Sequence, residues 1–227
     1  MTSSDTHREL KDRLYGQFAR IGKALASPQR LEMLELLAQG ERTVDSLAAE
    51  IGMSLANASQ HLQALRQAAL VDSRKEGLHV HYRLADPAVF DLCRTVRTVA
   101  ERRLADLERL VGEHFGDRAN VEAVAMDDLV RSLRSGDVVV LDTRPSSEYA
   151  AAHIAGAISV PVDELRRQLS QLPKRKRYVA YCRGPYCVYA DRAVEILRAS
   201  GRRAERLLEG FPDWRAAGLP IKAGNTP

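Results

Sequence analysis

Two closely spaced cysteines, Cys182 and Cys187, are the residues of this sequence best suited to covalent chemistry. An apolar stretch with strand character, residues 178–181, ends directly before Cys182, and a helical pattern begins near Val188. A thiol at a helix N-terminus faces unpaired backbone N–H groups and the positive end of the helix dipole, which lower its pKa. The sequence therefore predicts that Cys182 is a nucleophilic thiolate. The alternative is an inert cysteine buried at the end of a strand.

The loop between the two thiols has a composition that suits an anionic sulfur group. It consists of Arg183, Gly184, Pro185 and Tyr186. Gly184 and Pro185 allow the backbone to curl with its amides inward, where they can hold an anionic donor or a cysteine persulfide. Arg183 adds positive charge. We therefore expect a small sulfur donor or another thiol-reactive compound as the ligand of this loop.

A second group of residues has side chains that can read DNA. A helix is expected over residues 55–68, with Leu62 and Leu65 on its apolar face. The polar candidates of this segment are Ser54, Asn57, Ser59, Gln60 and His61. Such hydrogen-bonding side chains suit base edges and phosphates in the major groove. The alternatives are a solvated helix face for Asn57 and Gln60, and a packing role for His61.

Basic residues follow this helix in a segment of alternating polarity. After Leu70 the pattern predicts a hairpin with a turn at residues 75–77. Arg74, Lys75 and Arg83 flank its tip and can reach phosphates, which position a protein on DNA without specifying sequence.

The elements that must position these groups form two successive patterns. Helices are expected over residues 8–26, 30–38, 44–51 and 55–68, followed by the hairpin and one long helix over 87–115. Two short helices around a tight glycine turn are typical of a helix-turn-helix. The chain then becomes α/β, with strands at 138–141 and 178–181 and helices near 126–134, 162–169 and 188–199. We expect two domains, 1–116 and 121–227, joined by a polar linker at 116–120.

The first pattern resembles the ArsR family of bacterial repressors. The motifs that carry the resemblance are Ser27-Pro28-x-Arg30, Ser59-x-His61-Leu62, Glu76-Gly77 and Tyr82-Arg83-Leu84. The resemblance implies a mainly helical, winged helix-turn-helix domain. It also implies a homodimer through the first and last helices, bound to a near-palindromic operator in double-stranded DNA.

The second pattern resembles a single rhodanese domain with a parallel central sheet. The matching blocks are Leu141–Pro161, the loop from Tyr181 to Cys187, and Glu209–Pro220. The resemblance places a catalytic cysteine at Cys182. We interpret Asp142 and Arg144 as an ion pair that supports the loop. The chain departs from the family at Cys187, which we interpret as a resolving thiol that converts a Cys182 persulfide into a disulfide.

Metal ligands of the ArsR-like sensors are missing at the matching positions. Thr43, Val44 and Asp45 stand where arsenic sensors carry paired cysteines, and the last helix lacks the spacing of a zinc site. His79 and His81 fit wing histidines near phosphate better than a metal pair. We therefore expect neither a metal site nor a cofactor, and Cys93 as a small buried hydrophobe.

Composition sets further limits on function. The net charge is +4, but residues 1–116 carry sixteen basic and sixteen acidic residues, so DNA affinity there depends on local placement. Three cysteines and no signal-peptide core favour a reducing cytoplasm, and no apolar run predicts a membrane span. The leading hypothesis is a repressor that senses reactive sulfur. The alternatives are a sulfurtransferase tethered to DNA and an arsenic or heavy-metal regulator using Cys182 and Cys187.

Overall fold

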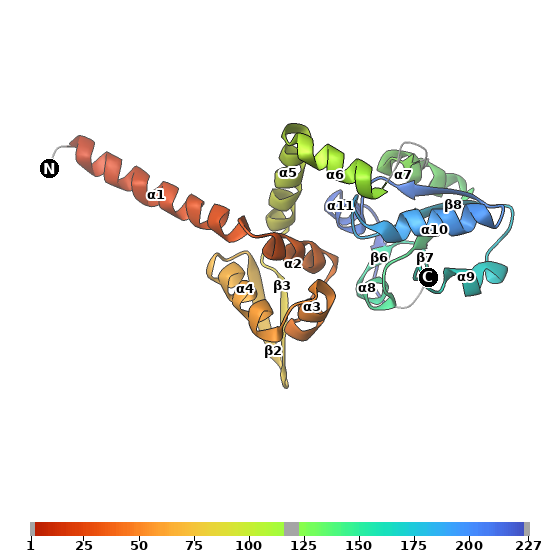
Figure 1. Cartoon of the computed structure of the whole chain (residues 1–227), viewed down its shortest axis with the longest axis horizontal. Coiled ribbons are helices and arrows are strands. Elements are labelled where there is room, and N and C mark those ends of the chain that lie inside the picture. Colours follow the sequence, from red (N-terminus) through yellow and green to blue (C-terminus); the bar gives the residue numbers. More distant parts are fainter. Residues whose placement is uncertain (1–2, 116–122, 225–227) are drawn as a thin grey trace. The chain divides into compact units, whose positions relative to one another are not determined.

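A computed structural model describes residues 3–115 and 123–224 of the chain (Figure 1). The chain divides into two compact units, one up to Val96 and one from Arg97 onward. This division falls within a helix, whereas the sequence placed a linker at 116–120. That segment belongs to residues 116–122, which lie outside the described part, so the expected domain boundary stays a prediction.

Capped helices build most of the first unit. They are α1 (Ser3–Leu25), α2 (Pro28–Gln39), α3 (Val44–Ile51) and α4 (Leu55–Gln67). The side chains of Ser27, Thr43 and Ser54 accept hydrogen bonds from backbone N–H groups of the first turns of α2, α3 and α4. Gly52 ends α3 in the left-handed conformation at φ +74°. The predicted helix-turn-helix is therefore confirmed.

The wing is a hairpin of β2 (Val71–Glu76) and β3 (His79–Leu84). Its turn comprises Gly77, at φ +59°, and Leu78, one to two residues later than the sequence suggested. A short strand that the sequence did not reveal, β1 (Arg42–Thr43), pairs with β3 and completes a three-stranded antiparallel sheet.

One apolar core holds the first unit together. Fully buried side chains from α2, α3 and α4 meet in it, including Met33, Leu47, Leu62 and Leu65. Of α1, only the last turns contribute, through Ile21, Ala24 and Leu25. The rest of α1 extends away from this core, as Figure 1 shows.

The long helix expected over residues 87–115 is two helices. These are α5 (Pro87–Arg103) and α6 (Ala105–Phe115), with Leu104 between them. Arg102 and Arg103 lie in the last turn of α5, and Asp106 and Glu108 in the first turn of α6. Each charge pair complements the dipole at its own helix end, which favours two shorter helices over one. None of the described helices is long and apolar enough to cross a membrane.

A five-stranded parallel sheet forms the second unit, in the order β4-β9-β8-β5-β7. Its strands are β4 (Ala123–Val124), β5 (Val138–Asp142), β7 (Ile158–Ser159), β8 (Arg177–Tyr181) and β9 (Arg203–Leu207). A second sheet pairs β6 (His153–Ile154) with β10 (Ile221–Lys222). The helical segments are α7 (Met126–Ser135), α8 (Ser146–Ala151), α9 (Leu165–Gln168), the 3-10 turn η2 (Leu169–Gln171), α10 (Val188–Ala199) and α11 (Phe211–Ala216).

Both faces of the large sheet are buried, as in other parallel sheets. Leu141, Tyr178 and Ala180 face a cluster with α9 and α10, which also contains Cys182. Alternate residues of the same strands, among them Val140, face α7 and α11. Cys182 therefore leaves the sheet on the face that α10 covers.

Candidate functional site

The two cysteines of the second unit are joined as a disulfide. Cys182 follows β8 directly, and its Cα atom lies 6.2 Å from that of Cys187, well within the range for such a bond. The side chain of Cys182 is almost completely buried, at 2% exposure. We call the segment from Cys182 to Cys187 the sulfur loop. Cys93, the third cysteine, is half-buried on α5 and takes no part in the disulfide.

The sulfur loop leads into α10 in a way that corrects one expectation. Cys187, not Cys182, is the N-cap residue of α10. The disulfide nevertheless brings the sulfur of Cys182 to this helix end, where the dipole favours negative charge. The backbone N–H of Cys187 donates to the carbonyl of Gly184 over 3.2 Å, so a tight turn closes the loop.

A second segment lies against the sulfur loop, and the sequence identified it as a family motif without predicting this contact. The Cα atom of Gly210 faces the backbone of Arg183 so closely that a Cβ atom there would lie 2.2 Å from the Arg183 carbonyl oxygen. Next to it, the backbone N–H of Phe211 donates to the carbonyl of Cys182 over 3.0 Å. Asp213 accepts from the N–H of Gly210 over 3.0 Å and fixes the segment from behind. The loop is therefore clamped by residues almost thirty positions further along the chain.

Arg183 forms a buried ion pair, which limits the charge it gives to the loop. Its Nη2 atom lies 2.6 Å from Oε1 of Glu148 on α8, and both side chains are largely buried. Its guanidinium also lies 5.7 Å from the centre of the Tyr189 ring. The positive charge expected near the thiols is thus offset by Glu148, which the sequence analysis did not single out.

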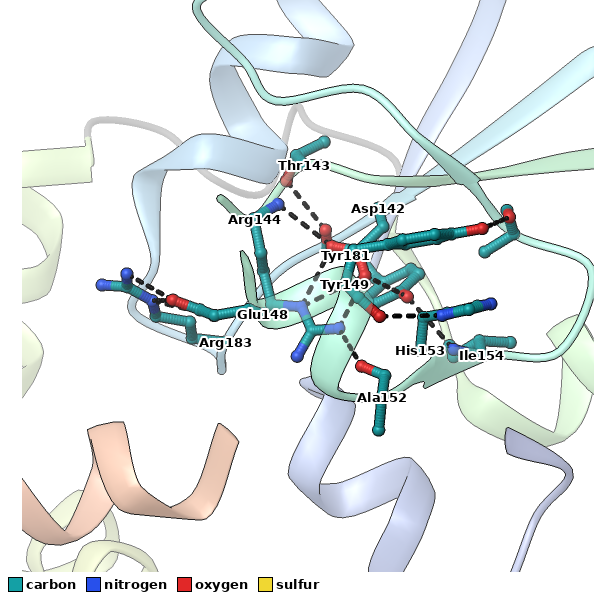
Figure 2. A network of polar contacts seen from close by, with 11 residues as sticks. Asp142, Thr143, Arg144, Glu148, Tyr149, Ala152, His153, Ile154, Tyr181 and Arg183 are labelled. Carbon is teal, nitrogen blue, oxygen red and sulfur yellow. Dashed lines mark hydrogen bonds and ion pairs between the residues drawn. The ribbon is translucent and has the colours of Figure 1, made fainter. Parts of the chain in front are cut away.

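Asp142 and Arg144 lie at the end of β5 in a fully buried ion pair, shown in Figure 2. Nη2 of Arg144 lies 2.6 Å from Oδ2 of Asp142, and its guanidinium stacks 4.1 Å from the centre of the Phe211 ring. Tyr181, the residue before Cys182, donates its hydroxyl to the same carboxylate. Burial and the Asp142 charge raise the pKa of Tyr181 well above its usual range, so the phenol stays protonated. This network holds the end of β8 from which Cys182 emerges.

Residues proposed to contact DNA lie on the surface of α4 and the wing. Ser54, Asn57 and Gln60 are exposed, and Ser59 and His61 are half-buried. The hydroxyl of Ser54 caps α4 by accepting from the N–H of Asn57 over 3.3 Å. The face opposite them is buried through Ala58, Leu62 and Leu65, as the apolar pattern predicted.

Two of the three basic wing residues are held by carboxylates. Arg74 hydrogen-bonds to Glu41 over 2.9 Å and also pairs with Glu76, while Arg83 pairs with Asp72 over 3.2 Å. The hydrogen bond from Arg74 lowers the pKa of Glu41 below its ordinary value. Lys75 is exposed at the wing. Lys75 is therefore better placed than Arg74 to approach a phosphate.

Within the described ranges, no three His, Cys, Asp or Glu side chains are grouped to hold a metal ion.

Two family models match separate parts of the chain. Residues 27–73 match "Bacterial regulatory protein, arsR family" and residues 125–217 match "Rhodanese-like domain". The HTH-type transcriptional regulator Rv0324 of Mycobacterium tuberculosis is 44% identical over 214 residues, which is 94% of each chain.

Solved structures resemble each half separately. One is the homodimeric winged helix-turn-helix DNA-binding domain of Mb0332 from Mycobacterium bovis, 47% identical, with a TM-score of 0.40 over 42% of this chain and 89% of that one. Another is a rhodanese-related protein from Thermoplasma volcanium, 27% identical, with a TM-score of 0.41 over 44% of this chain and 97% of that one. From the family models and its relative of almost equal length, the chain belongs to the arsR family of bacterial transcriptional regulators and carries a rhodanese-like domain at residues 125–217.

Proposed function

We propose that this regulator binds operator DNA as a homodimer and that reactive sulfur controls the binding through Cys182 and Cys187. The observation that carries the proposal is the position of the two cysteines, at bonding distance at the start of α10 in the rhodanese-like loop. A rhodanese loop needs one thiol to carry a persulfide. The second thiol gives this loop a route to a stable disulfide.

The proposed reaction has two steps. The reduced Cys182 thiolate attacks the outer sulfur of a persulfide donor, the S–S bond of the donor breaks, and its thiol leaves with the electron pair. The Cys187 thiolate then attacks Sγ of Cys182, a disulfide forms, and hydrosulfide leaves. Two thiols are oxidised and one sulfane sulfur is reduced to sulfide, so the balance needs no further oxidant.

Exposed apolar side chains on α1 support a dimer. Leu10, Leu14 and Phe18 recur every four residues along one face, and each is 47% to 65% exposed. Tyr15 packs its ring edge-on against Phe18 and is 67% exposed. A stripe of this kind on a helix that leaves its own core is best covered by another chain. We infer that a second copy covers it, which places two α4 helices for two operator half-sites.

The readout of DNA is assigned to α4 and the wing. Ala at Asn57 or Gln60 is expected to cost about 1–3 kcal/mol at the specific operator, because base-edge hydrogen bonds are lost. Ala at Lys75 is expected to weaken all DNA sequences alike and to reduce the salt dependence. Binding titrations on operator and scrambled duplexes at several salt concentrations separate the two. Equal losses on both duplexes for Asn57→Ala would contradict base readout.

The central test measures, on the same samples, the sulfur added to the protein and the affinity of the protein for operator DNA. Wild type, Cys182→Ser, Cys187→Ser and the control Cys93→Ser are reduced, desalted and treated with a persulfide donor. Intact mass and operator affinity are then measured. We expect a disulfide in wild type and Cys93→Ser, a persulfide of one added sulfur in Cys187→Ser, and no response in Cys182→Ser. An undiminished response of Cys182→Ser would overturn the proposal.

A second candidate ligand is a soft metal ion, favoured by the same pair of thiols. Two thiolates at the distance of Cys182 and Cys187 can bind arsenite or a similar thiophilic ion. Arsenite in the same experiment decides between the two: operator release by arsenite but not by persulfide would favour the metal, and the reverse would favour sulfur. A sulfurtransferase would instead pass sulfur on repeatedly to an outside acceptor without forming the disulfide.

A further inference from the structure

A small pocket lies at the carboxyl edge of the large sheet, and one of its lining residues, Tyr189, stands two positions after the sulfur loop. Its volume is about 270 Å³. The loops that follow β5 and β7 and the first turn of α10 line it through Thr143, Pro145, Ser146, Pro161, Val162, Asp163, Glu164 and Tyr189. A volume below the usual ~300–1,000 Å³ of ligand pockets suits a very small organic molecule.

The pocket occupies the place where open α/β sheets bind ligands. The chain runs from β5 to β7 on one side and then to β8 on the other, so the strand order reverses between β5 and β8. Ligands of such sheets bind at the carboxyl ends of the strands beside this reversal. Cys182 follows β8 at that edge.

Contacts connect the pocket walls to the two cysteines. The backbone N–H and the hydroxyl of Thr143 both donate to the carbonyl of Tyr181, the residue before Cys182, over 3.1 and 2.8 Å. Val162 and Tyr189 pack in the same apolar cluster as Cys182 and Cys187. Two residues of the pocket wall thus pack in one cluster with the cysteines, although no residue of the sulfur loop itself lines the pocket.

The charged side chains of the pocket are acidic. Glu164 is half-buried and accepts a hydrogen bond from Gln168 over 2.9 Å, which leaves its negative charge in place. Asp163 is exposed and lies 3.6 Å from Arg192, in a pair that solvent screens. The ring of Tyr189, whose centre lies 5.7 Å from the Arg183 guanidinium, adds an aromatic wall to the pocket. Carboxylates and an aromatic ring favour an ammonium group and disfavour anions such as thiosulfate.

We propose that this pocket receives the organic part of the sulfur donor, and that the donor is a small persulfide carrying an ammonium group. The assignment rests on the proposed function, because it supplies the donor for Cys182. The Cys182 thiolate attacks the outer sulfur of the donor R–S–SH, the donor S–S bond breaks, and R–S⁻ leaves while Cys182 keeps the transferred sulfur as a persulfide. The ammonium group lies toward Glu164 and Tyr189.

Two donors of opposite charge and similar size test the proposal. Full-length Cys187→Ser, in which the persulfide cannot be resolved, is reduced and mixed with cysteamine persulfide or mercaptopropionate persulfide. The rate of sulfur gain on Cys182 is followed by intact mass. The same rates are measured for Asp163→Asn/Glu164→Gln, and for Glu195→Gln as a control that removes an exposed charge from α10. Gln at 164 keeps a hydrogen-bonding group for Gln168.

The expected result is a preference of about fivefold for the cationic donor, the size of a partly screened charge interaction. The double variant should lose the preference and the Glu195→Gln control should keep it. Persulfide formation at equal rates from both donors would overturn the pocket assignment and leave the function of Cys182 intact. No persulfide on Cys182 from either donor would overturn both.

Discussion

At the scale of single residues, the sulfur loop depends on contacts made from elsewhere in the second unit. The backbone N–H of Phe211 donates to the carbonyl of Cys182, Gly210 lies against Arg183, and Glu148 forms an ion pair with Arg183. None of these three is a reactive residue. Their common effect is to hold the loop in one conformation, and a thiol can be preorganised only on a fixed loop.

Gly210 is the position where this clamp can be tested with one methyl group. Its φ of −100° is open to any residue, so only the contact with Arg183 forbids a side chain. Gly210→Ala is expected to push the loop away, to lower stability by about 1–3 kcal/mol and to slow persulfide formation on Cys182. Gly112→Ala in α6 is the control, because a Cβ there meets nothing within 4 Å. Chemical denaturation measures the change in stability, and intact mass followed over time measures the rate of persulfide formation. A Gly210→Ala protein that forms the persulfide as fast as wild type would argue against the clamp.

The wing contains a pH-sensitive ion pair. Arg74 lowers the pKa of Glu41, so the pair is complete above the ordinary carboxyl pKa and is lost only as the pH falls through the lowered value. Arg74→Ala should return the pKa of Glu41 toward its ordinary value. Titration of the Glu41 carboxyl by NMR in both proteins measures the difference, and unchanged titration would show that the pair does not form in solution.

At the scale of elements, the apolar pattern of α1 serves two purposes. The last turns of α1 pack into the core of the first unit, and its earlier turns expose an apolar stripe. A polar surface there would have been enough for a monomer. The exposed apolar stripe is therefore the feature of α1 that favours a dimer.

Charge placed in this stripe should weaken the dimer. Leu14→Glu and Phe18→Glu put a carboxylate where a partner helix is expected to pack, whereas Lys11→Glu changes charge at an exposed polar position of the same helix. Sedimentation across a concentration series should show that the dissociation constant of the dimer rises at least tenfold for Leu14→Glu and Phe18→Glu only. A tenfold rise corresponds to about 1.4 kcal/mol of dimerisation free energy. Identical behaviour of all three variants would remove α1 from the interface.

At the scale of the whole molecule, we propose that α5 carries a signal away from the sulfur loop. The helix begins in the first unit at Pro87 and continues into the second. Within the second unit, the hydroxyl of Tyr186 in the sulfur loop donates to Glu101 of α5 over 2.6 Å. This hydrogen bond is the contact through which, on the proposed mechanism, a rearrangement of the loop would act on the helix.

Tyr186→Phe removes this hydrogen bond and keeps the ring. We expect normal persulfide and disulfide formation but a smaller change in operator affinity on treatment with donor, because the chemistry is separated from its readout. Intact mass and operator titration on the same samples provide the measurement. As a control, Glu101→Gln in a chain that keeps Tyr186 preserves an acceptor for its hydroxyl and should retain most of the response. A full response in Tyr186→Phe would place the coupling elsewhere.

The sequence by itself determined the features that depend on neighbouring residues. The helices Val44–Ile51 and Val188–Ala199 begin and end where the sequence predicted, because apolar periodicity acts within one or two turns, and in the first of them the Thr43 side chain also caps the N-terminus. Motif order alone also identified both families. The expected long helix is divided at Leu104, where basic residues end α5 and acidic residues begin α6, as suits the dipoles of two separate helices. These charges are present in the sequence, but the prediction followed the continuous apolar pattern instead.

Only the tertiary structure decided how distant segments meet. Strand β9 escaped prediction because Arg203, Glu205 and Arg206 look exposed in sequence; two of them reach ion pairs, with Arg177 and Asp191, only once the sheet is assembled. The clamp at Gly210 was hidden for the same reason, since nothing local places it against Arg183. Five positions separate Cys182 from Cys187 in sequence, and the turn at Gly184, held from outside the loop, brings their sulfurs together.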